Sequence, residues 1–128
     1  MTASLILHNF FRSSTSIRVR AALNLKGLAY QQRTYALRQG EHRRPDYLAV
    51  NPQGLVPALQ LADGTVIAQS PAILEYLEEA WPEPPLLPQG ALARARVRSL
   101  AAAVACDIHP VNNLRVLQYI QTQFGADE

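Results

Sequence analysis

The chain has 128 residues, a length that suits one complete hydrophobic core, or one small domain with part of a second. Its 48% hydrophobic content is that of a folded globular protein, and a net charge of +2 is too small to favour nucleic acid as a partner. The single cysteine, Cys106, excludes an intrachain disulfide and a CxxC redox pair. Three scattered histidines predict no metal site, and without a leader pattern or a long apolar run we expect a cytoplasmic protein with no membrane segment.

The first half of the chain predicts a strand, a helix and a second strand. Leu5–His8 is a short apolar run typical of a strand. Apolar residues then recur at helical spacing, and Gly27 predicts the end of that helix; they are Ile17, Ala21, Leu25 and Leu28. Tyr30–Leu37 is the second predicted strand, and His42–Val50 follows as one or two helical turns.

A hairpin and a third helix complete this part of the chain. Residues 51–54 form a turn by composition, and Ala58–Leu61 then pairs with Thr65–Ala68 across an Asp-Gly turn. Ser70 is predicted to cap a helix that ends at Trp81, with Pro71 in its first turn. The order of elements predicts a mixed four-stranded α/β sheet with helices on its faces, a thioredoxin-like arrangement over residues 1–81.

Residues 82–90 hold four of the nine prolines and predict a semi-rigid linker. The segment from Ala91 to about Phe124 is alanine-rich and predicted to be helical, with a bend or break at Pro110. One helix or a broken pair cannot bury its own apolar face. We therefore expect residues 91–128 to be the first part of an all-helical domain, in a fragment of a longer protein.

Several hydroxyl side chains lie between the end of the first predicted strand and the start of the first predicted helix. Arg12 is followed by Ser13, Ser14, Thr15 and Ser16, at the end of a sheet where ligands bind in such folds. Hydroxyls and a helix N-terminus both favour an anion there, and a thiol held there ionises more readily. The segment contains no cysteine, so the thiol would belong to a ligand. Simple capping of the helix is the alternative interpretation.

Two further segments have backbone groups suited to a ligand. A proline such as Pro57 at a turn into a strand is commonly cis in this fold, and Val56 would then offer free N–H and C=O groups to a peptide-like ligand. The helix start at Gln69 and Ser70 can hold a carboxylate. The alternatives are a rigid turn and an ordinary capped helix.

Polar side chains also interrupt the last predicted helix. His109, Asn112 and Asn113 are spaced to share one helical face, with Arg115 at its edge. This pattern indicates either the wall of a binding site or a solvent-exposed helix break at Pro110.

Taken together, these motifs resemble the zeta class of glutathione S-transferases. Residues 11–30, FRSSTSIRVRAALNLKGLAY, are similar to the zeta signature SSCxxRVRIALxLKG, with Thr15 where the signature usually has cysteine. The segments NPQGLVPAL, IAQSPAILEYLEE and CDIHPVNNLRVLQYI are also similar to bacterial members of the class. The resemblance implies a homodimer with a thioredoxin-like domain, an all-helical domain and glutathione as cofactor.

The resemblance also assigns roles to residues. It implies that Ser13 and Ser14, with Thr15, address the glutathione sulfur. Other contacts are implied for Val56 and Pro57 (cysteinyl backbone), Gln69 and Ser70 (γ-glutamyl end), His42 (glycine carboxylate), and His109, Asn113 and Arg115 (the helical side of the site).

The implied reaction is the cis–trans isomerisation of maleylacetoacetate to fumarylacetoacetate in aromatic amino acid catabolism. A glutathione thiolate would add reversibly to the double bond while Arg12 and Arg115 hold the two carboxylates of the maleyl diacid. The alternatives are a maleylpyruvate isomerase, a general zeta-class or haloacid-converting transferase, and a non-catalytic binding module with this fold.

Overall fold

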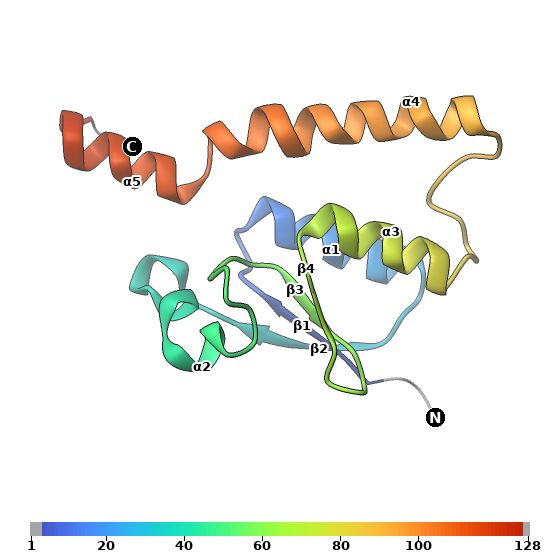
Figure 1. The fold of residues 1–128 in the computed structure, drawn as a ribbon, viewed down its shortest axis with the longest axis horizontal. Helices are drawn as coiled ribbons and strands as arrows, with labels where there is room; N and C mark the ends of the chain where they lie inside the picture. The colour runs from blue at the N-terminus through green and yellow to red at the C-terminus, as the bar shows by residue number, and fades with distance from the viewer. Residues whose placement is uncertain (1–3, 127–128) are drawn as a thin grey trace. The chain divides into compact units, whose positions relative to one another are not determined.

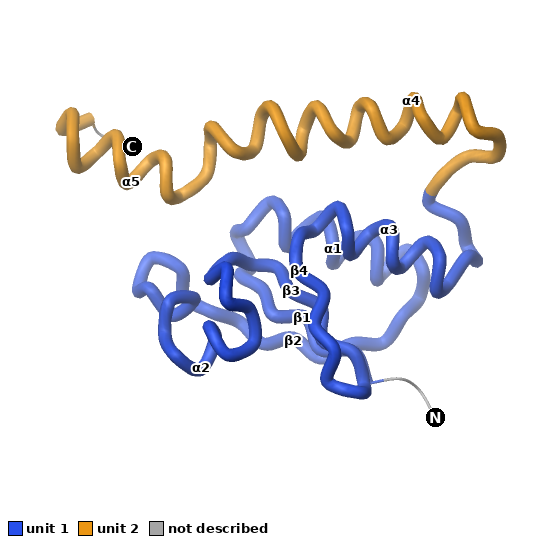
Figure 2. The backbone as a smooth tube through the Cα atoms, viewed as in Figure 1, with its two compact units in different colours: residues 1–86 blue, residues 87–128 orange. Residues whose placement is uncertain are grey.

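The computed structural model describes residues 4–126 (Figure 1). The chain forms two compact units, residues 1–86 and residues 87–128 (Figure 2), and each is described here by itself. The boundary between them lies inside the predicted linker, 82–90. No described helix has the length and apolar character needed to cross a membrane.

The first unit is built on a four-stranded sheet in the order β2-β1-β3-β4. The strands are β1 (Leu5–Asn9), β2 (Tyr30–Thr34), β3 (Ala58–Gln60) and β4 (Val66–Ala68). β1 and β2 run parallel, whereas β3 is antiparallel to both β1 and β4. This confirms the predicted thioredoxin-like mixed sheet.

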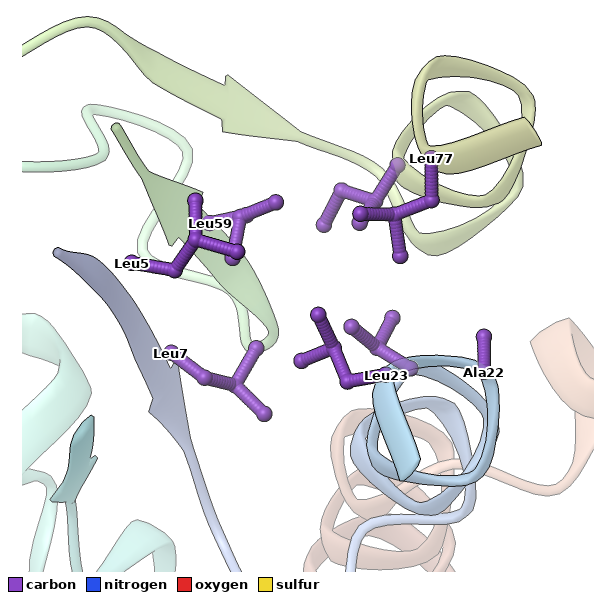
Figure 3. Close-up of a cluster of buried hydrophobic side chains, with 8 residues drawn as sticks. Leu5, Leu7, Ala22, Leu23, Leu59 and Leu77 are labelled. Carbon is purple, nitrogen blue, oxygen red and sulfur yellow. The ribbon is translucent and has the colours of Figure 1, made fainter. Parts of the chain in front are cut away.

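Two helices pack against each other and against one face of the sheet: α1 (Ser14–Leu25) and α3 (Ser70–Ala80). Their apolar faces and the inward side chains of the strands form one core (Figure 3). Its buried members are Leu5, Leu7, Val19, Ala22, Leu23, Leu59, Ile73 and Leu77. The segment between β2 and β3 contains the 3-10 turns η1 (Leu37–Gln39) and η2 (Glu41–Arg43) and the short helix α2 (Pro45–Leu48).

Two predicted boundaries were wrong in the first unit. β2 ends at Thr34 rather than Leu37, because its neighbour β1 ends at Asn9, the residue opposite Thr34. Ser70 does not cap α3: the capping position is Gln69, and Ser70 is the first helical residue. The Ser70 hydroxyl instead accepts a hydrogen bond from Arg18, which explains why it makes no capping bond.

The second unit contains α4 (Ala91–Ala102), a π-helical segment η3 (Ala103–Ile108), a 3-10 turn η4 (His109–Val111) and α5 (Leu114–Phe124). The helix is therefore broken around Pro110, as predicted. Because of this break His109, Asn112 and Asn113 do not share a helical face, and that prediction was wrong. Asn113 caps α5, accepting a bond from the Val116 N–H.

A buried ion pair closes the end of the first unit. Lys26, the only lysine of the chain, follows α1 and donates from Nζ to Glu78 Oε2 at 2.9 Å. The same ammonium donates to the carbonyls of Trp81 and Pro84, and Glu78 accepts from the Leu86 N–H. One cation and one carboxylate thus fasten residues 81–86 to α1 and α3.

This network gives a stability prediction. Lys26→Met should lower the free energy of unfolding by about 3–5 kcal/mol, because it leaves the Glu78 carboxylate buried without its cation. Urea unfolding measures the loss, and adding Glu78→Gln to Lys26→Met should restore part of it. The matched control is Arg44→Gln, which breaks an exposed pair with Glu41 and should cost less than about 1 kcal/mol. Equal losses in the two single variants would contradict the prediction.

Candidate functional site

The hydroxyl run at the start of α1 is anchored by its own hydrogen bonds. Ser13 is the N-cap and accepts a bond from the Ser16 N–H at 3.2 Å. Ser16 is buried and accepts from the Phe10 N–H at 3.3 Å, which ties the preceding loop to the helix. Ser14 is the first helical residue and is exposed. The predicted sulfur-binding segment is therefore a rigid helix start rather than a free loop.

Two of the predicted segments meet at Thr15. The Thr15 hydroxyl lies 2.9 Å from Ser13 Oγ and donates to the Val56 carbonyl at 3.2 Å. The Val56-Pro57 peptide bond is cis, which is the isomer common at such turns and one that the sequence left open. The expectation of a free Val56 carbonyl was wrong, because Thr15 already donates to it, while the Val56 N–H has no hydrogen-bond partner among residues 4–126.

An arginine that the sequence did not single out supports the start of α3. Arg18 lies one turn after Ser14 on α1 and donates to Ser70 Oγ at 2.8 Å. Ser70 is 3% exposed. Because a guanidinium can only donate, Ser70 accepts from Arg18 and keeps its own hydroxyl proton for another acceptor. The first-turn N–H groups of α3 and the Arg18 charge both favour an anion at this point.

Gln69 precedes that helix in an unusual conformation. Its φ of 70° is the only positive value at a non-glycine residue among the described part of the chain. The Gln69 side chain donates to Gln53 Oε1 at 2.8 Å, joining the turn before β3 to the start of α3. A strained residue of this kind persists where its surroundings hold it, commonly at ligand sites.

A second arginine holds the loop that carries Arg12. Arg20 donates to the side chain of Asn9 at 2.6 Å and to the Phe11 carbonyl at 2.9 Å. Arg12 itself is exposed. Arg18 and Arg20 are the two arginines of the RVR motif. This motif could have indicated that both residues matter for the site, although the sequence alone did not show what either contacts.

Two side chains hold the turn before Val56 by hydrogen bonds to its backbone. Tyr47 Oη and Asn51 Nδ2 both donate to the Leu55 carbonyl, at 2.6 and 2.8 Å. Burial raises the pKa of Tyr47 to about 12, so its hydroxyl stays protonated. Gly54 has a φ of +61°, and a Cβ there would lie 3.3 Å from the His42 carbonyl oxygen, so any other residue would be strained.

A buried histidine supports that turn from the sheet. His8 of β1 is fully buried; its Nδ1 lies 2.8 Å from Tyr35 Oη and its Nε2 lies 3.1 Å from Gln60 Oε1. An amide oxygen only accepts, so Nε2 carries the proton and Nδ1 accepts from Tyr35. The Tyr35 ring packs on Tyr47 with centroids 4.3 Å apart. His8 is thus linked through two tyrosines to the Leu55 carbonyl.

His42 also has a polar atom suited to a ligand. Its Nδ1 is buried and has no hydrogen-bond partner within residues 4–126. Burial, followed by the charge of Arg43, lowers the pKa of His42 below its ordinary value of 6.5. A buried nitrogen without a partner costs free energy, which a ligand group could recover.

The first unit brings together Ser13, Thr15, Val56 and Pro57, and separately joins Ser70 to α1 through Arg18. Their donors suit an elongated ligand with a peptide-like middle and an anionic end. His109, Asn113 and Arg115 belong to the second unit, so their part in the same site remains a prediction. Among residues 4–126 no three His, Cys, Asp or Glu side chains are grouped as a metal site would need.

Comparisons with known proteins show which family the first unit matches. Residues 12–80 match the family described as "Glutathione S-transferase, N-terminal domain". The chain is 55% identical over 124 residues to the maleylacetoacetate isomerase of Pseudomonas aeruginosa, covering 95% of this chain and 58% of that protein. The chain therefore spans less than two thirds of the length of such relatives.

Solved structures give the same picture. A maleyl pyruvate isomerase, described as a bacterial zeta-class glutathione S-transferase in its holo form, superposes with a TM-score of 0.91 at 54% identity, covering 95% of this chain and 57% of that one. A maleylacetoacetate isomerase from Methylobacterium extorquens, solved with malonate and glutathione, superposes with a TM-score of 0.90 at 48% identity and the same coverages.

The buried histidine predicts how stability depends on pH. Burial, together with the charge of Arg33, lowers the pKa of His8 below 6.5, although its bond to Gln60 acts in the opposite direction. The unfolded chain therefore binds more protons below pH 6.5 than the folded chain, and the free energy of unfolding should fall as the pH falls. Urea unfolding between about pH 5 and pH 7.5 measures this slope.

His8→Gln should flatten the slope, because glutamine does not titrate. The pKa of His42 is also lowered, so this residue adds to the same pH dependence of stability. His42→Gln is the matched comparison and should remove only the part of the slope that His42 contributes. A protein that becomes more stable on acidification, or a slope that His8→Gln leaves unchanged, would show that His8 is not held neutral.

Proposed function

The chain belongs to the glutathione S-transferase family, whose N-terminal domain it matches over residues 12–80, and we propose that it carries the glutathione-binding part of an enzyme that isomerises maleyl diacids from cis to trans. Within the family its resemblance is to the zeta class. The observation that carries the proposal is the meeting of the Ser13 and Thr15 hydroxyls with the Val56 backbone, which offers a thiol site and a peptide site side by side.

The residues present fit glutathione as the cofactor. Within residues 4–126 the Val56 N–H and His42 Nδ1 have no hydrogen-bond partner. The Val56 N–H and carbonyl suit the cysteinyl backbone, and His42 Nδ1 suits the glycine carboxylate. Gln69 and Ser70, with Arg18 behind the serine, suit the γ-glutamyl carboxylate. Neighbours already hold the turn before Val56 and the start of α3, so little ordering of these two segments is needed on binding.

When bound, glutathione would supply a thiolate nucleophile for reversible addition to the cis double bond. The chain's own residues would lower the thiol pKa and hold the substrate. The Ser13 and Ser14 hydroxyls and the α1 N-terminus favour the ionised sulfur. Arg12, exposed beside this helix start, and Arg115 of the second unit would hold the two carboxylates.

Two substrates are supported about equally, since relatives named for maleylacetoacetate and for maleylpyruvate are similarly close. Turnover of maleylacetone and of maleylpyruvate, measured with and without glutathione in the complete protein that carries this sequence, tests the proposal. Loss of the cis alkene only when glutathione is present supports it. Conjugation without isomerisation would indicate a general or haloacid-converting transferase, and glutathione binding without either would indicate a binding module.

The assembly and location of the protein are also proposals. We infer a homodimer and a cytoplasmic enzyme of aromatic amino acid catabolism from the resemblance to the zeta class. A sedimentation measurement that gives twice the chain mass of the complete protein supports the dimer, and a monomer at assay concentration would contradict it.

Removal of the Ser70 hydroxyl should weaken glutathione binding by about 1–3 kcal/mol, because the γ-glutamyl carboxylate loses a donor that Arg18 orients. Calorimetry on Ser70→Ala measures the change. Arg18→Gln should also weaken binding, whereas Arg33→Gln, which removes one exposed charge from β2, is the matched control and should not. Unchanged affinity in Ser70→Ala would exclude the assignment of Gln69 and Ser70.

The two proposed carboxylate contacts can be separated from glutathione binding. Arg12→Lys and Arg115→Lys keep the charge but lose the two-pronged geometry of the guanidinium. Each should lower the turnover of maleyl substrates about tenfold or more, an effect on the order of 1.4 kcal/mol. Conjugation of a neutral chloronitrobenzene should be unaffected. Equal losses with both kinds of substrate would mean that these arginines serve folding or glutathione binding.

A further inference from the structure

The hydroxyl protons of Ser13 and Thr15 have assigned directions in this structure. The Val56 carbonyl can only accept, so the one hydroxyl proton of Thr15 lies on its 3.2 Å bond to Val56. The 2.9 Å contact between Ser13 and Thr15 must then use the proton of Ser13. Ser13 Oγ also accepts from the Ser16 N–H. As the bonds stand, Ser13 has no proton left for a sulfur anion.

We propose that Thr15 couples recognition of the ligand backbone at Val56 to ionisation of the ligand thiol at Ser13. The proposal rests on glutathione being the ligand. The Val56 carbonyl has two lone pairs, so a ligand N–H can donate to it beside Thr15, and the carbonyl then keeps a donor when Thr15 turns its proton towards Ser13 Oγ. Ser13 then turns its own proton to the sulfur. No O–H bond breaks in this exchange; two hydroxyl protons only change acceptors.

Bond strengths favour the exchanged arrangement once a thiolate is present. The bond given up, from Thr15 to Val56, joins two neutral groups and is long at 3.2 Å. The bond gained joins a hydroxyl to an anion, and charge-assisted bonds are roughly twice as strong as neutral ones. Thr15 would also donate to Ser13 and strengthen Ser13 as a donor, because hydrogen bonds in a chain polarise one another.

Thr15 is suited to this coupling because its side chain both donates and accepts. The zeta signature usually has cysteine at this position, and a thiol is only a weak donor and a weak acceptor. Thr15 is half-buried, so solvent does not replace its bonds freely. In this proposal Thr15 is a positioning residue that acts on the sulfur only through Ser13.

The test follows the thiolate absorbance of bound glutathione against pH. Thr15→Val removes the hydroxyl with little change in shape, and it should raise the pKa of the bound thiol by about half a unit while Thr15→Ser leaves it unchanged. Thr34→Val on the exposed face of β2 is the matched control and should have no effect. In a Ser13→Ala background, Thr15→Val should have no effect on the thiol pKa. Thermal unfolding checks that each variant is folded.

A second ligand tests the link to Val56 directly. An ester isostere of glutathione, with oxygen in place of the cysteinyl N–H, cannot donate to the Val56 carbonyl. Its bound thiol should have a pKa about one unit above that of glutathione in the parent protein and in Thr15→Ser. The difference should disappear in Thr15→Val, where Ser13 has no threonine to donate to.

Several results would overturn the inference while leaving the proposed function intact. One is a Thr15→Val effect that persists in the Ser13→Ala background, and another is a bound thiol pKa that Thr15→Val leaves unchanged. A third is a thiol pKa that Ser14→Ala raises and Ser13→Ala does not, which would assign the sulfur to Ser14. By contrast, a parent protein that neither binds glutathione nor lowers its thiol pKa would reject the proposed function itself.

Discussion

Burial of β1 on both faces of the sheet is the constraint on which the site depends. Leu5 and Leu7 point into the core beneath α1 and α3, while His8 points to the opposite face. The side chains on one face of β1 pack in the apolar core, and on the other face His8 forms hydrogen bonds with Tyr35 and Gln60. A strand held on two sides delivers its carboxyl end, Asn9, at one fixed point, and the Ser13 helix start follows from there.

Some positively charged side chains of the first unit stabilise the fold, whereas another lies at the proposed ligand site. The Lys26 ammonium donates its three hydrogen bonds to Glu78 and to two backbone carbonyls, and it holds the segment after α3 in place. Arg20 is used by the backbone around Asn9 and Phe11. Arg18 differs, since its only described partner is the neutral Ser70 hydroxyl, and it lies near the positive end of α3. That arrangement is unfavourable alone and favourable with an anion present.

Much of this fold could be predicted from sequence because local patterns agreed with the global arrangement. The Asp63-Gly64 turn is a local signal, and in the structure Asp63 accepts from the Thr65 N–H while Gly64 has a φ of +88°. The end of β2 could not be predicted from Tyr30–Leu37, since it depends on where β1 stops. The hydroxyl of Ser70 resembled a cap because the pattern Ser-Pro is the same whether or not an arginine 52 residues earlier donates to it.

The site shows the same limit more sharply. The sequence indicated Thr15 and Val56 as separate features, 41 residues apart, and their contact depends on the sheet, in which β1, the strand before α1, pairs with β3, the strand after Val56. Thr15 and Ser13 each have one hydroxyl proton to donate. In the structure both protons are donated to acceptors within the protein, so neither is available to a ligand sulfur. A backbone carbonyl that was expected to be free is therefore bonded to a residue of the proposed thiol site. In the proposed coupling, ligand binding at Val56 and ionisation of the ligand thiol at Ser13 depend on the same two hydroxyl groups, so they are not independent properties of two motifs.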